Sequence, residues 1–144
     1  MWPVLRSVLA VLAGIVAMAI VTLAIESTAI PLLMRLFPTA FPDHVAFSHN
    51  FWARLLIVGY TMLAVAIGGY VAAWIARRSV ILHAVIAGAV QIALTAYFVL
   101  VASYPIIEPP TWKWIVMLIL TLPAAAFGGM LRALQSSPGP TQVA

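Results

Sequence analysis

Three polar side chains, His83, Gln91 and Thr95, interrupt an otherwise apolar stretch of the sequence. Gln91 and Thr95 are one helical turn apart, and His83 precedes them on a roughly similar face. An ionisable group inside a membrane segment is a default candidate for a proton or solute path. The alternative is that this polar stripe forms hydrogen bonds to neighbouring helices, and that His83 bonds a neighbouring helix or a lipid headgroup. The sequence favours the second interpretation, because interhelical hydrogen bonding is the commoner use of such residues.

His83 is also the weak candidate for a cofactor ligand, since an imidazole can be one axial ligand of a tetrapyrrole. No second histidine lies inside an apolar segment, so a bis-histidine haem within one chain is excluded. The sequence therefore implies no particular cofactor.

Glu26 ends the first apolar segment and Arg54 begins the next. The two residues are candidates for an ion pair at one membrane interface, and a proton-coupled role for them is the sharper alternative. Asp43, His44 and His49 are the one cluster of metal-ligating residue types. His44 and His49 are five positions apart, unlike the i,i+4 histidines of a zinc helix, so we expect no metal site.

The residues that an enzyme needs are missing from the sequence. It has no cysteine, no nucleophile motif, no phosphate-binding loop and no pair of carboxylates. We therefore expect that the chain is not an enzyme.

Composition places these residues in a membrane. The chain is 65% apolar and 7% charged, with a mean hydropathy of +1.16, whereas soluble domains are about half apolar and a quarter charged. The pI of about 10.1 comes from basic residues at the ends of apolar segments, so the expected partner is the lipid bilayer and no nucleic acid.

Four apolar segments are each long enough to cross a bilayer, which takes about 20 helical residues. They cover residues 4–25, 53–76, 80–103 and 114–134. We predict an all-α membrane protein with a single domain over residues 1–134, followed by a disordered cytoplasmic tail over 135–144. The first apolar run is longer than that of a signal peptide, so we expect it to be retained as a span.

The first external loop is the longest connection and is expected to contain short interfacial helices. Pro31 suits the first turn of one such helix. Asp43 suits the N-cap of a second, which would run directly into the second span.

The basic residues predict the orientation, because Lys and Arg near span ends favour the cytoplasmic side. One side of the predicted bundle has four arginines and no acid: Arg6, Arg77, Arg78 and Arg132. On the other side Arg35, Arg54 and Lys113 are balanced by Glu26, Asp43 and Glu108. Both termini are therefore expected in the cytoplasm.

Small residues recur one helical turn apart in every segment, as close helix packing in lipid requires. Ala64, Gly68 and Ala72 form such a stripe in the second segment, with Gly69 on its flank. The predicted packing residues of the other segments are Gly14, Gly88, Gly128 and Gly129.

The stripes are part of an internal duplication. Aligning Gly68-Gly69 with Gly128-Gly129 also matches Ala64 to Ala124, and the first and third segments match more weakly. Because both copies begin on the same side, we predict two helical hairpins in a parallel repeat.

"GGYVAAWIA", "HAVIAGAV" and "LPAAAFGGMLR" resemble segments of a group of small, uncharacterised bacterial membrane proteins with four spans. The resemblance implies the four-helix fold and a location in the bacterial cytoplasmic membrane. It implies no activity.

Two functions remain open from the sequence. The first is a protein that acts through helix packing, as a homo-oligomer or as an accessory subunit of a membrane complex with another membrane protein. The alternative is a small transporter or channel-like protein whose path is lined by His83, Gln91 and Thr95. The absence of a charge at mid-membrane depth favours the first.

Overall fold

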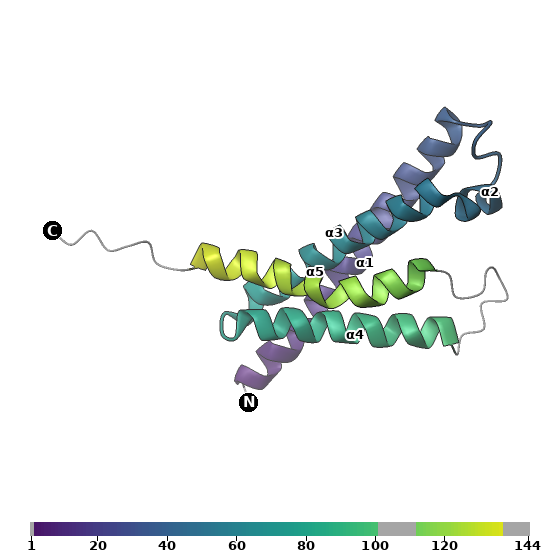
Figure 1. Cartoon of the computed structure of the whole chain (residues 1–144). Coiled ribbons are helices and arrows are strands. Elements are labelled where there is room, and N and C mark those ends of the chain that lie inside the picture. Colours follow the sequence, from purple (N-terminus) through teal and green to yellow (C-terminus); the bar gives the residue numbers. More distant parts are fainter. Residues whose placement is uncertain (1, 101–111, 137–144) are drawn as a thin grey trace.

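The computed structural model describes residues 2–100 and 112–136, and the regular structure within these ranges is entirely α-helical. The helices in chain order are α1 (Trp2–Leu36), α2 (His44–His49), α3 (Phe51–Ala76), α4 (Val80–Leu100) and α5 (Trp112–Ser136) (Figure 1). The four long helices are long and apolar enough to cross a membrane. This confirms the predicted all-α fold with four spans, and the chain is a multi-pass membrane protein. The predicted tail lies outside the described residues from 137 onward.

Helix α1 is longer than the sequence predicts. It continues without a break for 35 residues through Pro31 to Leu36, so the separate interfacial helix expected at Pro31 is part of α1 instead. A membrane helix tolerates proline, and hydroxyl side chains before Pro31 bond to the helix backbone. Ser27 and Thr28 both donate to the Ala24 carbonyl oxygen, at 3.2 and 2.7 Å. At 1.5 Å per residue α1 is about 52 Å long, well beyond a hydrocarbon core of about 30 Å.

Helix α2 is a separate element between α1 and α3. Asp43 caps it as predicted, because its side chain accepts a hydrogen bond from the Ala46 N–H at 2.7 Å. The expected continuous run into the second span is broken at Asn50, whose side chain accepts from the N–H groups of Trp52 and Ala53. The junction arises because this carboxamide satisfies the first N–H groups of α3, which have no partner within the helix.

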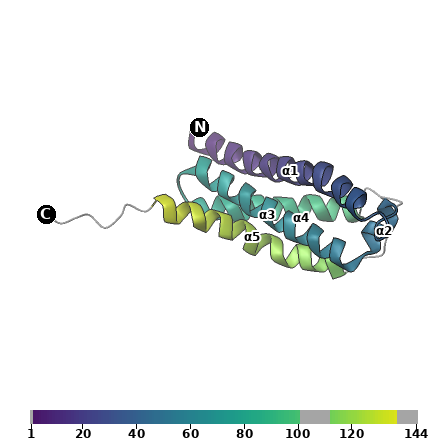
Figure 2. The same ribbon diagram turned by 90° about the horizontal axis from the view of Figure 1, so that it is seen from above.

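Helix α3 is the centre of the bundle, since it contacts α1, α2, α4 and α5. Figure 1 shows α1 alongside α3 and α4 alongside α5, with the two pairs crossing, and in Figure 2 α1 and α5 lie on opposite sides. The most extensive contact joins α3 to α5, the helices with paired glycines. A strict twofold repeat would make the α3–α4 contact equivalent to one between α1 and α5. Among the described residues α1 and α5 make no contact of comparable extent.

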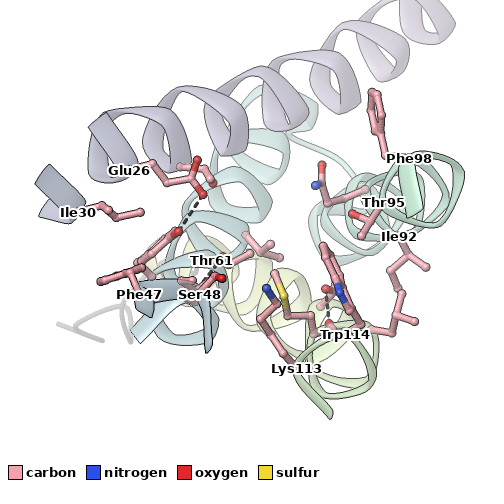
Figure 3. Close-up of a pocket in the computed structure, with 18 of the residues that line it drawn as sticks. Glu26, Ile30, Phe47, Ser48, Thr61, Ile92, Thr95, Phe98, Lys113 and Trp114 are labelled. Atoms are coloured by element: carbon pink, nitrogen blue, oxygen red, sulfur yellow. Dashed lines mark hydrogen bonds between the residues drawn. The ribbon is translucent and has the colours of Figure 1, made fainter. Parts of the chain in front are cut away.

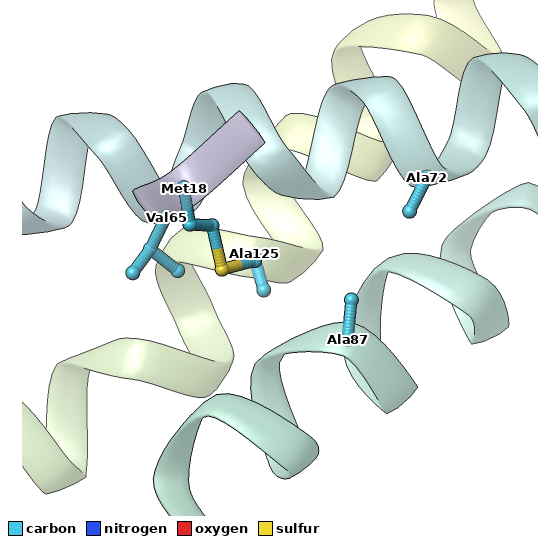
Figure 4. Close-up of a cluster of buried hydrophobic side chains, with 5 residues drawn as sticks. All are labelled: Met18, Val65, Ala72, Ala87 and Ala125. Atoms are coloured by element: carbon cyan, nitrogen blue, oxygen red, sulfur yellow. The ribbon is translucent and has the colours of Figure 1, made fainter. Parts of the chain in front are cut away.

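The core contains side chains from all four long helices, and most of them are small. It consists of Met18, Val65, Ala72, Ala87 and Ala125 (Figure 4). Only Met18 and Val65 are large, so the helix axes approach closely. Large apolar side chains such as Val4 and Leu23 are instead exposed, which suits helices whose outer faces contact lipid.

Candidate functional site

A cavity of about 610 Å³ lies at the end of the bundle that carries α2, and we call it the α2-end cavity. Helices α1 to α5 all contribute to its lining (Figure 3). Most of the wall is apolar, from residues such as Ile30, Phe47 and Met117. The polar groups on which the argument below depends are Glu26, Tyr60, Thr61, Gln91, Thr95 and Lys113.

One side of the cavity is held by a hydrogen bond between α1 and α3. The Tyr60 hydroxyl donates to Oε1 of Glu26 at 2.8 Å, and Tyr60 is 7% exposed. The ion pair of Glu26 with Arg54 stays a prediction. The structure gives Arg54 a bond from Nε to the Ser48 carbonyl oxygen at 2.6 Å. Tyr60 was not predicted as the partner of Glu26, because tyrosine is common in apolar helices. The available signal was a hydroxyl group within a predicted span.

The opposite wall carries two members of the predicted polar stripe, Gln91 and Thr95, both half-buried on α4. Nearby hydroxyls are already used as donors within their helices. Thr61 donates to the Ile57 carbonyl at 2.7 Å, and Thr121 donates to the Met117 carbonyl at 2.6 Å. Their oxygens therefore offer acceptor sites, whereas the Gln91 amide can both donate and accept.

The charges of the lining balance. Among the described lining residues Glu26 is the one acid and Lys113 the one Lys or Arg. The ammonium of Lys113 lies 4.8 Å from the ring centroid of Trp114, within cation–π range. The formal charges of these two residues cancel.

The floor of the cavity is closed by the core of the bundle. Val65 lines the cavity and also belongs to the core cluster, where it is 2% exposed. Thr121 at the same depth is 6% exposed. The cavity therefore meets the core of the bundle at Val65.

His83 does not share this cavity with Gln91 and Thr95. It lies in the first turn of α4, with Nδ1 3.0 Å from the Ser79 carbonyl oxygen. The structure thus separates the predicted stripe into two polar residues in the cavity and one at the other end of the bundle. His83 is not among the residues that line the α2-end cavity.

The predicted packing residues of α1 and α3 lie between these helices. A Cβ built on Gly14 would come 2.8 Å from the Gly68 carbonyl oxygen and 2.9 Å from the Ala72 Cβ. A Cβ on Gly68 would overlap the Met18 side chain. Ala64 and Ala72 are both fully buried.

The remaining packing glycines face α5 or lie on it. A Cβ on Gly69 would overlap the Ala125 carbonyl oxygen, and one on Gly128 would overlap the Ala66 carbonyl oxygen. On the contact of α4 with α5, a Cβ on Gly88 would come 2.8 Å from the Ala125 Cβ, and one on Gly129 would come 2.7 Å from the Ala84 Cβ. These glycines are all occupied by contacts inside this chain.

The predicted cluster of metal-ligating types is dispersed by α2. Asp43 caps the helix, His44 lines the cavity and His49 is exposed at the last turn. Within residues 2–100 and 112–136, no group of three His, Asp or Glu side chains could hold a metal ion.

Comparisons with protein-family models, with curated proteins and with solved structures find no match to this chain.

Proposed function

We propose that this chain is a non-enzymatic binding protein of the bacterial cytoplasmic membrane, which takes up a small amphipathic molecule in the α2-end cavity. The observation that carries the proposal is the cavity itself, with its mostly apolar lining and few polar groups. Its volume of about 610 Å³ lies within the roughly 300–1,000 Å³ typical of small-molecule sites, which also combine apolar walls with a few polar groups.

The charge of the lining favours a neutral or zwitterionic headgroup. A single negative charge, on Glu26, and a single positive charge, on Lys113, border the cavity. Burying an unpaired ion against apolar walls is costly. A zwitterion could offer a cation to Glu26 and an anion to Lys113, while Gln91 and the threonine oxygens bond its polar atoms.

The glycines contact neighbouring helices of the same chain, so these positions serve the packing of one bundle. A role through packing against a second copy or another membrane protein stays a second proposal, and such a role would not use the α2-end cavity.

A transport function would use the same cavity and would require its floor to open. The floor at Val65 is part of the core cluster, so opening would separate α1, α4 and α5 from α3. Binding needs no such change, and we therefore place it ahead of transport.

The proposed orientation has both termini in the cytoplasm and the cavity toward the outer side. Its support is that Arg6, Arg77 and Arg132 line one common pocket at the end opposite α2, as the preference of basic residues for the cytoplasmic side would require.

The test uses three octyl amphiphiles that differ only in their headgroup: a sulfobetaine, a trimethylammonium and a sulfonate. Thermal unfolding of the purified protein in dodecyl maltoside is measured with each. We expect the sulfobetaine to raise the melting temperature most. Glu26→Gln should move the preference toward the sulfonate and Lys113→Gln toward the trimethylammonium, because each variant leaves one charge unbalanced.

Gln91→Leu should weaken binding of all three amphiphiles, since it removes a hydrogen-bonding group from the wall. The matched control is Gln135→Leu, because Gln135 accepts from the Tyr70 hydroxyl on the exposed surface, away from the cavity. Equal stabilisation by the three amphiphiles in the wild type, or an equal effect of the two glutamine variants, would refute the proposed site.

A further inference from the structure

A second pocket, of about 500 Å³, lies at the end of the bundle opposite α2. Three arginines from three helices line it: Arg6 of α1, Arg77 at the C-cap of α3, and Arg132 near the end of α5. We call it the arginine pocket. Nothing in the proposed function of the α2-end cavity uses it.

The guanidinium of Arg6 is held in place before any ligand arrives. Its Nε donates to the Ile75 carbonyl oxygen at 2.8 Å, across 69 residues of sequence. A guanidinium has five N–H donors, so four remain on the two terminal nitrogens. This is the fork geometry that binds phosphate through two parallel hydrogen bonds.

The position of Arg77 is fixed by the backbone. Arg77 is in the left-handed conformation, with φ of 58°, and its N–H bonds the Ala73 carbonyl at 3.4 Å. Glycine is the usual residue at a left-handed cap, because a Cβ there is strained. The chain thus carries a guanidinium at a cap where glycine would be favoured.

The positive charge of the arginine pocket is not balanced by the described residues. Its lining contains no acid. Glu26 and Asp43 belong to the opposite end of the bundle, and Glu108 is outside the described ranges. Two long helices begin and two end here, so their dipoles offset one another and the guanidiniums set the sign of the local field.

An apolar groove adjoins the arginine pocket and indicates the source of the anion. Leu5, Leu9, Arg6 and Ile75 line this groove, of about 200 Å³, and the last two also line the pocket. Leu5 and Leu9 are about half exposed, at 53% and 52%. Free phosphate would have no use for such a surface, whereas an acyl chain would cover it.

We propose that the arginine pocket binds the phosphate of an anionic glycerophospholipid, with an acyl chain along the groove of Leu5 and Leu9. Basic pockets between membrane helices on the cytoplasmic side are suited to anionic headgroups. Bound lipid would join the ends of α1, α3 and α5, so it would stabilise the bundle at this end.

The test is native mass spectrometry of the purified full chain with equal amounts of dioleoylphosphatidylglycerol and dioleoylphosphatidylcholine. We expect preferential retention of phosphatidylglycerol. Arg6→Gln and Arg132→Gln should each weaken it about tenfold, since each variant removes a charge-assisted hydrogen bond. Arg6→Lys, which keeps the charge and loses the fork, should fall between wild type and Arg6→Gln.

The matched control is Arg78→Gln. It removes one arginine charge from the same end of the bundle, next to Arg77, but Arg78 does not line the pocket. It should change retention by no more than about twofold, as expected for an exposed charge. Equal retention of both lipids, or a loss in Arg78→Gln as large as in Arg6→Gln and Arg132→Gln, would overturn the proposal. A separate arm adds inorganic phosphate: displacement of the lipid by phosphate would identify free phosphate as the occupant and would also overturn it.

Discussion

At the scale of single residues, the glycines of α3 differ in what surrounds them. Gly69 lies against the backbone of Ala125, with Cα and carbonyl carbon both 3.0 Å from a built Cβ. Gly59, on the same helix, has nothing within 4 Å of a built Cβ. The same substitution should therefore have opposite consequences at the two positions, because a backbone cannot yield as a flexible side chain does.

We expect Gly69→Ala to destabilise the bundle by about 1–3 kcal/mol, the usual cost of overpacking. Gly128→Ala should behave alike, because its Cβ would overlap the Ala66 carbonyl oxygen. Gly59→Ala should be neutral or slightly stabilising, since alanine is the better helix former. Unfolding in detergent measures all three, and equal stability of Gly59→Ala and Gly69→Ala would contradict the close contact of α3 with α5.

The hydrogen bond from Tyr60 to Glu26 is the second residue-scale feature. We expect Tyr60→Phe to cost about 1–3 kcal/mol, because it leaves a part-buried carboxylate without this donor. The control is Tyr70→Phe, which removes a comparable 2.6 Å bond to Gln135 that is exposed. It should cost less than about 0.5 kcal/mol.

A double-mutant cycle of Tyr60→Phe with Glu26→Leu isolates the pair, because leucine has no acceptor for the Tyr60 hydroxyl. A coupling energy near zero would mean that the bond between α1 and α3 contributes nothing to stability.

At the scale of elements, Asn50 separates α2 from α3. Its side chain accepts from Trp52 N at 2.9 Å and from Ala53 N at 3.2 Å, and its own N–H bonds the Phe47 carbonyl. One residue thus ends one helix and begins the next. The break fixes the direction of α2, and α2 supplies His44, Val45, Phe47 and Ser48 to the cavity wall.

We expect Asn50→Ala to cost about 1 kcal/mol, the typical value for an N-cap. The effect should be local, so hydrogen exchange should quicken at Trp52 and Ala53 and in α2 while the contact of α3 with α5 stays protected. Asn50→Asp is the control, because aspartate is an equally good N-cap. Unchanged exchange in Asn50→Ala would show that the cap does not hold the junction.

At the scale of the whole molecule, the two ends of the bundle differ in charge and shape. The α2 end has the larger cavity with balanced charges, and the opposite end has the arginine pocket. Such an asymmetry sets the orientation in the membrane through the basic residues.

We expect a reporter fused after Leu134 to be active only in its cytoplasmic form, and one fused after Thr39 only in its external form. Thr39 lies in the turn between α1 and α2, so the two fusions sample opposite ends of the bundle. Replacing Arg77 and Arg78 with glutamine should weaken this bias, since charges in a short loop have the strongest effect. External activity of the Leu134 fusion would reverse the proposed orientation.

The sequence by itself determined that the protein is helical and where its four long helices lie. Composition required a lipid environment, and apolar length then required helices, because a backbone in lipid must satisfy its own hydrogen bonds. The Asp43 cap was also predictable from the sequence, because an N-cap bonds a backbone N–H only three residues further along the chain. The continuation of α1 past Pro31 was not, because a proline is compatible both with the first turn of a helix and with the interior of a membrane helix.

Only the tertiary structure decided which residues face one another. The small-residue stripes indicated contact faces, but helices that are apolar all round left open which helix lies against each face and at what crossing angle. The hydrogen bond between Glu26 and Tyr60 follows from that arrangement. The glycine spacing indicated close contact, but its partners had to come from helix positions in space: Gly68 faces α1, while its neighbour Gly69 faces α5.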